Sequence, residues 1–383
     1  MRVLHLAPPR TRPDRITAHT FIDEEIDAIR RAGVECLTLP DRIDASRAGA
    51  IAFAARHAVD VPLVTLRDVR ETLHAVRIEY AAAQLIRDCR VDVVHSHFGW
   101  PAGFGGLLAA SETGVPLVAS IRGMDILTSP AIRYGLRLNP QYDAAVKTLL
   151  RRADRTLYAT RYMRDRGIAL GAPDDRAILI RKGVDLARFH PAEDRAAAQR
   201  ALGINGPMVL AVGSLSPRKG LIRIVNALST LQDLAWTFVI CGDGPERESL
   251  QQWATTLGIG DRVRFAGNVD RGTIGGYFGA ADVFVHAALM EAAGNVILEA
   301  LASGCPVVCT DSGGPAEYVV DGTTGFVVDG DDDGALGNRL RLVLGCASLR
   351  ARLSRCAREF AEQHLAYARM IRDYITTYDA VVA

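Results

Sequence analysis

The chain has 383 residues, of which 49% are hydrophobic and 23% charged, a composition typical of a globular enzyme with room for two buried cores. The formal net charge of +1 excludes a global field that attracts nucleic acid, and no hydrophobic run approaches the length of a membrane span. The seven cysteines are odd in number and lack zinc-type spacing, and residues 1–9 turn polar too soon for a signal peptide. We therefore expect a cytoplasmic protein.

The first half of the chain alternates short apolar runs with helical patterns. Strands are predicted at residues 2–7, 34–39, 91–97, 115–121, 155–159 and 177–180. Between them, helical patterns are predicted at 21–32, 41–90, 98–113 and 140–168. Strands that alternate with helices in this way build a parallel sheet covered by helices.

Polar residues stand at the ends of two of these strands. His97 closes the strand at 91–97, and Arg122 and Asp125 directly follow the strand at 115–121. Open α/β sheets place their ligands at the carboxyl ends of the strands. The three residues are therefore candidates for contacts with a sugar or an acceptor, although for His97 a purely structural role is an equally good interpretation.

The second half opens with a buried strand at 208–213. The adjacent cations Arg218 and Lys219 follow it, next to Gly220 and the start of a predicted helix at 221–231. Such a pair suits a diphosphate clamp, and its alternative is a solvated loop pair. Further strands are predicted at 236–241, 263–269, 282–286, 306–310 and 326–328. We interpret the acidic run at 329–333 as a helix start or solvated turn rather than a metal site, and the last forty residues as helical.

The stretch from Glu291 to Gly304 is the most informative one. Gly294 and Asn295 suit the start of a helix, and free N–H groups at a helix start attract phosphate. Glu299 follows Asn295 by four residues, which is about 6 Å along a helix axis and roughly the step from a pyrophosphate to its ribose. Glu291 stands before the helix and can accept hydrogen bonds from sugar hydroxyls. The stretch predicts a nucleotide-sugar site, and the alternative is an ordinary helix start of an α/β protein.

Glu291 and Glu299, separated by seven residues and followed by Ala-Leu-Ala-Ser-Gly-Cys-Pro-Val-Val, resemble the paired-glutamate signature of the family 4 retaining nucleotide-sugar glycosyltransferases. The Gly183-Val184-Asp185 segment and Lys219-Gly220 also match that family. The resemblance implies the B-type (GT-B) fold, an α/β fold class with two Rossmann-like domains facing a cleft. It implies an N-terminal acceptor-binding domain at 1–190, a C-terminal nucleotide-sugar-binding domain at 207–360, and a C-terminal helix at 361–383 crossing back to the first domain.

The resemblance also implies a function and the residues that carry it. A sugar would pass from a nucleotide-sugar, with a UDP-sugar favoured, to an acceptor hydroxyl with retention of the anomeric configuration. Lys219 and Arg218 would stabilise the departing diphosphate, and Glu291 would orient the sugar. The donor contacts implied by the family are Gly213, Ser214, Asn268, Gly294, Asn295, Val296 and Glu299. No metal and no other cofactor is expected.

The chain departs from the family pattern in places that matter for this function. Pro8-Pro9-Arg10-Thr11-Arg12 stands where many members carry a glycine pair. Ser214 stands where an arginine is usual, which makes Arg218 the candidate for the second cation. Arg122 stands where a donor-contacting histidine is usual. Because arginine grips phosphate or carboxylate, Arg122 indicates either a remodelled sugar contact or an anionic acceptor.

Several alternatives remain open at this point. The same fold serves nucleotide-sugar epimerases and glycoside phosphorylases, and the departures above also suit a catalytically inactive binding subunit. The acceptor is a lipid-linked glycan, a polysaccharide precursor or a small molecule. Residues 1–187 carry 27 basic and 22 acidic side chains, which favours an anionic acceptor or a peripheral contact with the inner membrane face, against the alternative of a solvated arginine-rich surface.

Overall fold

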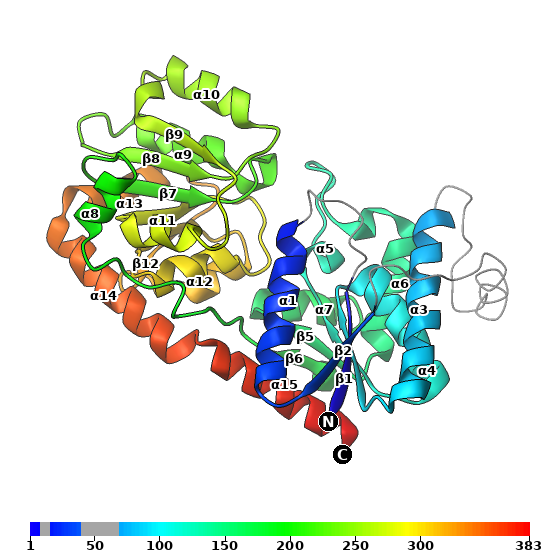
Figure 1. The fold of residues 1–383 in the computed structure, drawn as a ribbon. Helices are drawn as coiled ribbons and strands as arrows, with labels where there is room; N and C mark the ends of the chain where they lie inside the picture. The colour runs from blue at the N-terminus through cyan, green and yellow to red at the C-terminus, as the bar shows by residue number, and fades with distance from the viewer. Residues whose placement is uncertain (8–15, 40–68) are drawn as a thin grey trace. The chain divides into compact units, whose positions relative to one another are not determined.

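The computed structural model describes residues 1–7, 16–39 and 69–383 (Figure 1). The predicted departure at Pro8 to Arg12 and residues 41–68 of the predicted helical region lie outside the described residues. By its internal contacts the chain divides into two compact units. Unit 1 comprises Met1–Arg181 together with Ile371–Ala383, and unit 2 comprises Lys182–Met370. The first boundary between the units falls between Arg181 and Lys182. The domains expected from the sequence are 1–190 and 207–360.

Unit 1 is built on a parallel sheet with the strand order β2-β1-β3-β4-β5-β6. Its strands are β1 (Arg2–Leu6), β2 (Glu35–Thr38), β3 (Val93–His97), β4 (Leu117–Ser120), β5 (Arg155–Tyr158) and β6 (Ala177–Leu179). Its helices are α1 (Ile16–Arg31), α3 (Val69–Cys89), α4 (Phe104–Thr113), α5 (Gly123–Ile126), α6 (Pro140–Arg152) and α7 (Arg161–Ala169). The strands β3 and β4 are buried along their whole length, as expected where helices cover both faces of a parallel sheet.

Unit 2 repeats this architecture with the strand order β12-β11-β10-β7-β8-β9. Its strands are β7 (Met208–Val212), β8 (Thr237–Cys241), β9 (Val263–Gly267), β10 (Val283–His286), β11 (Val307–Thr310) and β12 (Gly325–Val328). Its helices are α8 (Arg195–Ala201), α9 (Leu221–Ser229), α10 (Arg247–Thr256), α11 (Ile274–Ala280), α12 (Asn295–Ala302), α13 (Asp333–Gly345) and α14 (Ala347–His364). The strand order reverses between β7 and β10, so the loops after these two strands diverge from a common point.

The predicted fold class of two Rossmann-like sheets is confirmed, and the differences lie at element boundaries. Helix α1 begins at Ile16 rather than at Phe21, and α9 ends at Ser229 rather than at Leu231. The acidic run at 329–333 is a helix start, as predicted: the Asp332 side chain accepts hydrogen bonds from the N–H groups of Gly334 and Ala335. Among the described helices, none is long and apolar enough to cross a membrane.

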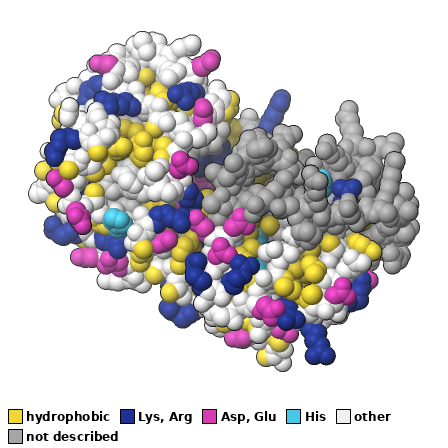
Figure 2. Space-filling view, viewed as in Figure 1, with side chains coloured by type: hydrophobic (Ala, Val, Ile, Leu, Met, Phe, Trp, Pro, Cys, Tyr) yellow, Lys and Arg dark blue, Asp and Glu magenta, His cyan; other side chains and the backbone are white. Residues whose placement is uncertain are grey.

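Acidic and basic side chains are interspersed on the surface of both units. On the face drawn in Figure 2, Lys and Arg side chains alternate with Asp and Glu over the described surface. This pattern agrees with the near-zero net charge of the chain.

The last helix, α15 (Tyr367–Val382), contributes its residues from Ile371 onward to unit 1. Tyr378 on this helix is fully buried, and its hydroxyl lies 2.6 Å from Nδ1 of His95 on β3. The other ring nitrogen of His95, Nε2, lies 2.8 Å from Oγ of Ser120 on β4. The imidazole thus ties the terminal helix to two central strands of the first sheet.

Replacing Tyr378 by phenylalanine should lower stability because it leaves Nδ1 of the buried His95 without its hydroxyl partner. An unsatisfied buried polar group costs about 1–3 kcal/mol, so we expect a clear fall in the urea midpoint of unfolding. The matched control is Tyr80→Phe on α3, where the ring is 47% exposed. Equal midpoints for the two variants would contradict this assignment.

Candidate functional site

The loops after β7 and β10 pack against each other at the switch point of the second sheet. The first loop leads through the short 3-10 helix η5 (Pro217–Lys219) to Gly220 and α9. Gly220 has a φ of 61°, and a Cβ at this position would lie 2.0 Å from the carbonyl oxygen of Ala287, just after β10. Only glycine fits there. This close approach holds the cation pair of η5 against the segment that leads to α12.

Two cations from η5 share one carboxylate oxygen. Nζ of Lys219 lies 2.5 Å and Nη1 of Arg218 lies 2.8 Å from Oε2 of Glu291. Nη1 of Arg218 also donates to the carbonyl oxygen of Met290 at 3.0 Å. Burial opposes the ionisation of Glu291, but the charges of Lys219 and Arg218 outweigh it and hold the pKa of this carboxyl well below its usual range. The sequence-based candidates Lys219, Arg218 and Glu291 are thus brought together.

The backbone on both sides of Glu291 is fixed. The N–H of Glu291 donates to the carbonyl oxygen of Ser312 at 3.2 Å, and its own carbonyl oxygen accepts from the N–H of Gly314 at 3.2 Å. Gly294 then adopts a φ of 70°, which favours glycine, and α12 begins at Asn295. The first N–H groups of this helix have no partner within the helix, and its positive dipole end lies at the same switch point.

Other predicted donor contacts take different positions. Glu299 lies one turn into α12, is 4% exposed, and its Oε1 accepts from Nη1 of Arg271 at 2.9 Å. A Cβ on Gly213, directly after β7, would lie 3.4 Å from Cε of Lys219, so Gly213 borders the cation pair. Ser214 contacts Ser216, with 3.4 Å between their hydroxyl oxygens. Asn268 is exposed beyond the end of β9, two strands from β7.

Sequence reasoning missed His286 and Arg271. His286 is the last residue of β10, is 4% exposed, and its Nε2 lies 3.9 Å from Oε2 of Glu291. Burial lowers the pKa of His286 to about 3, and the nearby Lys219 acts in the same direction. A polar residue that closes an apolar strand was the available signal for His286, the same one that singled out His97. Arg271 stands in a loop and carries no such signal.

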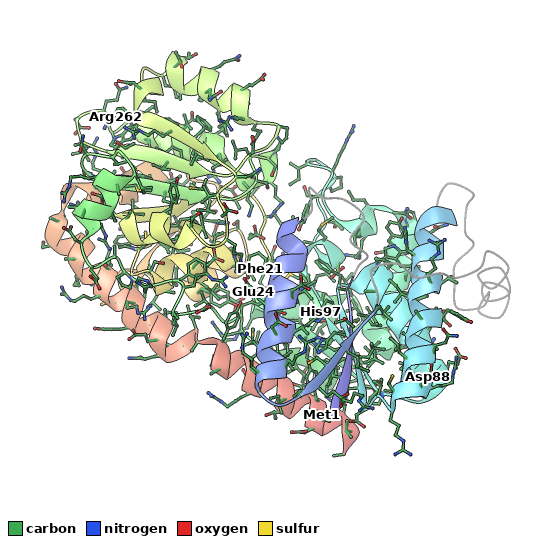
Figure 3. The ribbon with its side chains drawn as sticks, viewed as in Figure 1. Met1, Phe21, Glu24, Asp88, His97 and Arg262 are labelled. Carbon is green, nitrogen blue, oxygen red and sulfur yellow. The ribbon has the colours of Figure 1, made fainter. Side chains whose placement is uncertain are left out.

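The candidates of unit 1 form a second cluster, around the switch point between β1 and β3 (Figure 3 labels His97). Nη1 and Nη2 of Arg122 donate to the two carboxylate oxygens of Glu25 on α1, at 3.3 and 2.7 Å. Nη2 also lies 3.0 Å from Nδ1 of His97. The guanidinium that the sequence offered to a ligand anion is therefore occupied by a carboxylate of the same unit, and its side chain is 15% exposed.

Asp125 lies beside this cluster and is fully buried. Its Oδ2 accepts a hydrogen bond from the backbone N–H of Arg122 at 2.7 Å, which closes the first turn of α5. Burial raises the pKa of Asp125 to about 7, although the backbone N–H groups of Arg122 and Gly99 oppose this. Its position makes Asp125 a support for the turn that carries Arg122.

The buried trio His5, His95 and His97 is the one group of described residues whose spacing suits a metal ion, with ligand atoms within 4.8 Å of one another. Nδ1 of His5 lies 3.2 Å from Nε2 of His97. Because Arg122 can only donate, it fixes Nδ1 of His97 as an acceptor, and Nε2 of His97 then carries the proton. A protonated Nε2 cannot ligate a metal, so the trio fits a hydrogen-bond network better than a metal centre.

Comparison with known proteins identifies the family. A model described as Glycosyltransferase Family 4 matches residues 18–188, and one described as Glycosyl transferases group 1 matches residues 194–360. The D-inositol 3-phosphate glycosyltransferase of Geodermatophilus obscurus is 32% identical over 351 residues, which are 83% of this chain and 76% of that protein. The chain belongs to the family 4 glycosyltransferases of the GT-B type.

Two further relatives show how much of each protein this chain shares. The D-inositol 3-phosphate glycosyltransferase of Streptomyces avermitilis is 34% identical over 71% of this chain and 61% of its own length. A GDP-mannose-dependent alpha-(1-6)-phosphatidylinositol monomannoside mannosyltransferase of Mycolicibacterium smegmatis is 33% identical over 66% of this chain and 67% of its own length. The chain thus spans from 61% to 76% of these three relatives.

Solved structures support the fold of the glycosyltransferase. Sucrose-phosphate synthase from Thermosynechococcus elongatus has a TM-score of 0.79 at 20% identity and covers 100% of this chain and 99% of that chain. Anabaena HepE in complex with UDP and glucose has a TM-score of 0.76 at 20% identity and covers 99% of this chain and 100% of that chain. At this identity the similarity establishes the fold alone.

The pairing of Arg122 with Glu25 predicts an uneven loss of stability between two glutamates. Glu25→Ala leaves a buried guanidinium without its carboxylate, which should cost about 3 kcal/mol in the free energy of unfolding. Glu35→Ala breaks a pair with Arg2 in which the glutamate is 55% exposed, so its cost should stay under about 1 kcal/mol. Urea unfolding of both variants measures the difference, and similar losses would show that Glu25 does not neutralise a buried charge.

The raised pKa of Asp125 predicts a pH dependence with a definite sign. A carboxyl whose folded pKa lies above its ordinary value of 3.8 binds its proton more tightly in the folded state. Its contribution is therefore complete in acid and is lost as pH rises towards about 7, at about 1.4 kcal/mol per unit of pKa shift. Asp125→Asn should flatten this fall in melting temperature between pH about 4 and pH about 7. If the melting temperatures of the wild type and Asp125→Asn change with pH in parallel, the assignment is refuted. The matched control is Asp88→Asn at an exposed position, which should keep the wild-type profile.

Proposed function

We propose that this glycosyltransferase moves a hexosyl group from a nucleoside diphosphate sugar to an acceptor hydroxyl with retention of the anomeric configuration. The observation that carries the proposal is the cluster at the switch point of unit 2. Lys219 and Arg218 converge on Glu291, three residues before Gly294, the N-cap of α12. A pair of cations beside a helix start provides what a leaving diphosphate needs. The pathway would be glycan, glycolipid or natural-product biosynthesis.

Departure of the leaving group places negative charge on the diphosphate. On the proposed function, Lys219 and Arg218 stabilise that charge together with the N–H groups at the start of α12. These donors are held in place before the reaction, so little reorganisation is needed as the charge develops. In the resembling family the departing phosphate is thought to take the acceptor proton on the same face of the sugar, so the proposal requires no separate general base.

The two glutamates would then have separate tasks. Glu291 would orient the sugar by accepting hydrogen bonds from its hydroxyl groups, and Glu299 would hold the ribose. Arg271 supports the second task because its guanidinium fixes the Glu299 carboxylate from one side. The remaining proposed donor contacts are Gly213, Ser214, the N–H groups of residues 294–296, and Asn268, which would reach the base through its backbone.

We also propose the nucleotide base of the donor and the chemical class of the acceptor. We favour a UDP-sugar, since this is the usual donor of the resembling family, and GDP-mannose is the competing donor because one relative depends on it.

The relatives named above act on inositol phosphates, either free or in a lipid. A phosphate-bearing acceptor is therefore our choice for this chain. Arg122 is the proposed contact for that phosphate, since an anionic acceptor can compete with Glu25 for its guanidinium. We propose action in the cytoplasm, at the inner membrane face if the acceptor is a lipid.

A panel of UDP-sugars and GDP-mannose tests the donor class directly. Binding to the folded state alone raises the melting temperature with the logarithm of ligand saturation, so the true donor should give the largest shift. With that donor, inositol 3-phosphate and phosphatidylinositol serve as acceptors, and proton NMR of the product should show the anomeric configuration of the donor. An inverted product would refute retention.

The same assays distinguish the alternative functions. An altered donor sugar without acceptor would indicate an epimerase, and release of sugar from a disaccharide by phosphate would indicate a phosphorylase. Absence of transfer and hydrolysis would indicate a binding subunit.

Substitutions at the cluster test the roles of its members. Lys219→Ala and Glu291→Ala should each reduce transfer by about 100-fold or more while the protein stays folded, because each removes a group held at the reacting sugar diphosphate. The matched controls are Lys147→Ala and Glu248→Ala, which change side chains on α6 and α10 outside the cluster. Full activity in either cluster variant would refute the assigned roles.

A further inference from the structure

His286 is a buried polar residue for which the proposed reaction gives no task. It ends β10, between β7 and β11 in the second sheet, and both of its ring nitrogens lack a hydrogen-bond partner within the part of the chain that the structure describes. An unpartnered imidazole at 4% exposure is costly, so its retention in the core requires a reason. The nearest charged oxygen is Oε2 of Glu291, 3.9 Å from Nε2.

The surroundings of His286 determine its charge and its tautomer. Lys219 and Arg218 from η5 and Glu291 from the loop before α12 are the charged groups that act on it. Burial and the two cations keep the imidazole neutral, with a pKa lowered to about 3. A neutral imidazole carries one N–H and one lone pair. Because Nε2 faces a carboxylate oxygen, the favourable tautomer places the proton on Nε2.

The distance of 3.9 Å is too long for a hydrogen bond, and the reason is visible in the cluster. Oε2 of Glu291 already accepts from Lys219 at 2.5 Å and from Arg218 at 2.8 Å. A diphosphate at this site would compete for both cations. Glu291 would then keep its negative charge in a buried position with fewer donors, which is unfavourable unless another donor replaces them.

We propose that His286 is a positioning residue that donates its Nε2–H to Glu291 when a sugar diphosphate draws Lys219 and Arg218 away from that carboxylate. This inference rests on the proposed function of the cluster. A movement of about 1 Å brings Nε2 within hydrogen-bond distance of Oε2. The exchange of partners keeps Glu291 ionised and oriented towards the sugar while the cations serve the diphosphate.

The exchange has a pH signature. In the free protein the two cations keep Glu291 ionised, and their withdrawal raises the pKa of Glu291 in the complex. The N–H of His286 limits that rise. Without this donor, Glu291 gains a proton on binding at mildly acidic pH, and binding then becomes tighter as pH falls. A loss of packing alone would weaken binding equally at every pH.

The test compares the full-length wild type with His286→Leu and His286→Gln by isothermal titration calorimetry. The probes are UDP-glucose and GDP-mannose, whose diphosphates carry no group that titrates near neutrality. The wild type should bind its donor with an affinity that is nearly constant from about pH 5.5 to about pH 7.5. His286→Leu should bind about tenfold more weakly at the upper pH and should regain most of this loss at the lower pH.

His286→Gln is the rescue variant because its amide offers an N–H near the position of Nε2. It should bind within about twofold of the wild type at both pH values. Wild-type affinity in His286→Leu would overturn the inference, and so would a pH-independent loss shared by both variants. If the wild type binds neither probe, the proposed function of the cluster fails first. Binding by the wild type with unaffected variants would remove the inference alone and leave the proposed function intact.

Discussion

The sharing of one glutamate oxygen by two cations is the interaction on which the site of unit 2 depends. Lys219 and Arg218 bring two positive charges to Oε2 of Glu291, and the carboxylate neutralises only one of them. The excess charge lies beside the start of α12, whose dipole has the same sign at this end. A partly buried positive field of this kind attracts an anion strongly because little solvent screens it. The strand order creates this juxtaposition, since it makes β7 and β10 neighbours.

The two sheets treat their switch points differently. In unit 1, the Glu25 carboxylate pairs with the Arg122 guanidinium, which in turn donates to His97. The charge of Arg122 is thus balanced within the unit, although Nε of Arg122, Nε2 of His5 and Oδ1 of Asp125 have no hydrogen-bond partner among the described residues. In unit 2, positive charge remains in excess and the imidazole of His286 has no partner among the described residues. A balanced ion pair stabilises a fold, whereas an excess of positive charge can be balanced by an anionic ligand. This difference in charge is why we propose the diphosphate site in unit 2.

The sequence was informative about elements and chemistry but not about which side chains meet. Apolar runs and the helix start at Gly294 predict the strands and α12, because local patterns dictate local structure. The sequence did not predict a role for Glu25 because a carboxylate on a helix usually faces solvent. Only the packing of α1 against the sheet shows that it neutralises Arg122. The sequence predicts His286 only as the end of an apolar strand, although His97, which also ends a strand, is predicted as a candidate site residue.

Arg122 shows what a residue type predicts and what only the packing of the chain reveals. From the sequence, an arginine at a strand end indicates an anion to be bound, and its chemistry does fit one. In the structure Glu25 supplies that anion, at 2.7 Å, so the residue type was informative and the identity of its partner was not.

Glu291 is the opposite case, an anion whose partners are cations. Its partners in the free protein are the very cations that the proposed diphosphate needs. On the proposed function, the carboxylate is a resident anion that keeps Lys219 and Arg218 in place until the donor binds. A diphosphate carries more charge than one carboxylate and would displace it towards the sugar, so that binding of the donor and orientation of the sugar would be a single event.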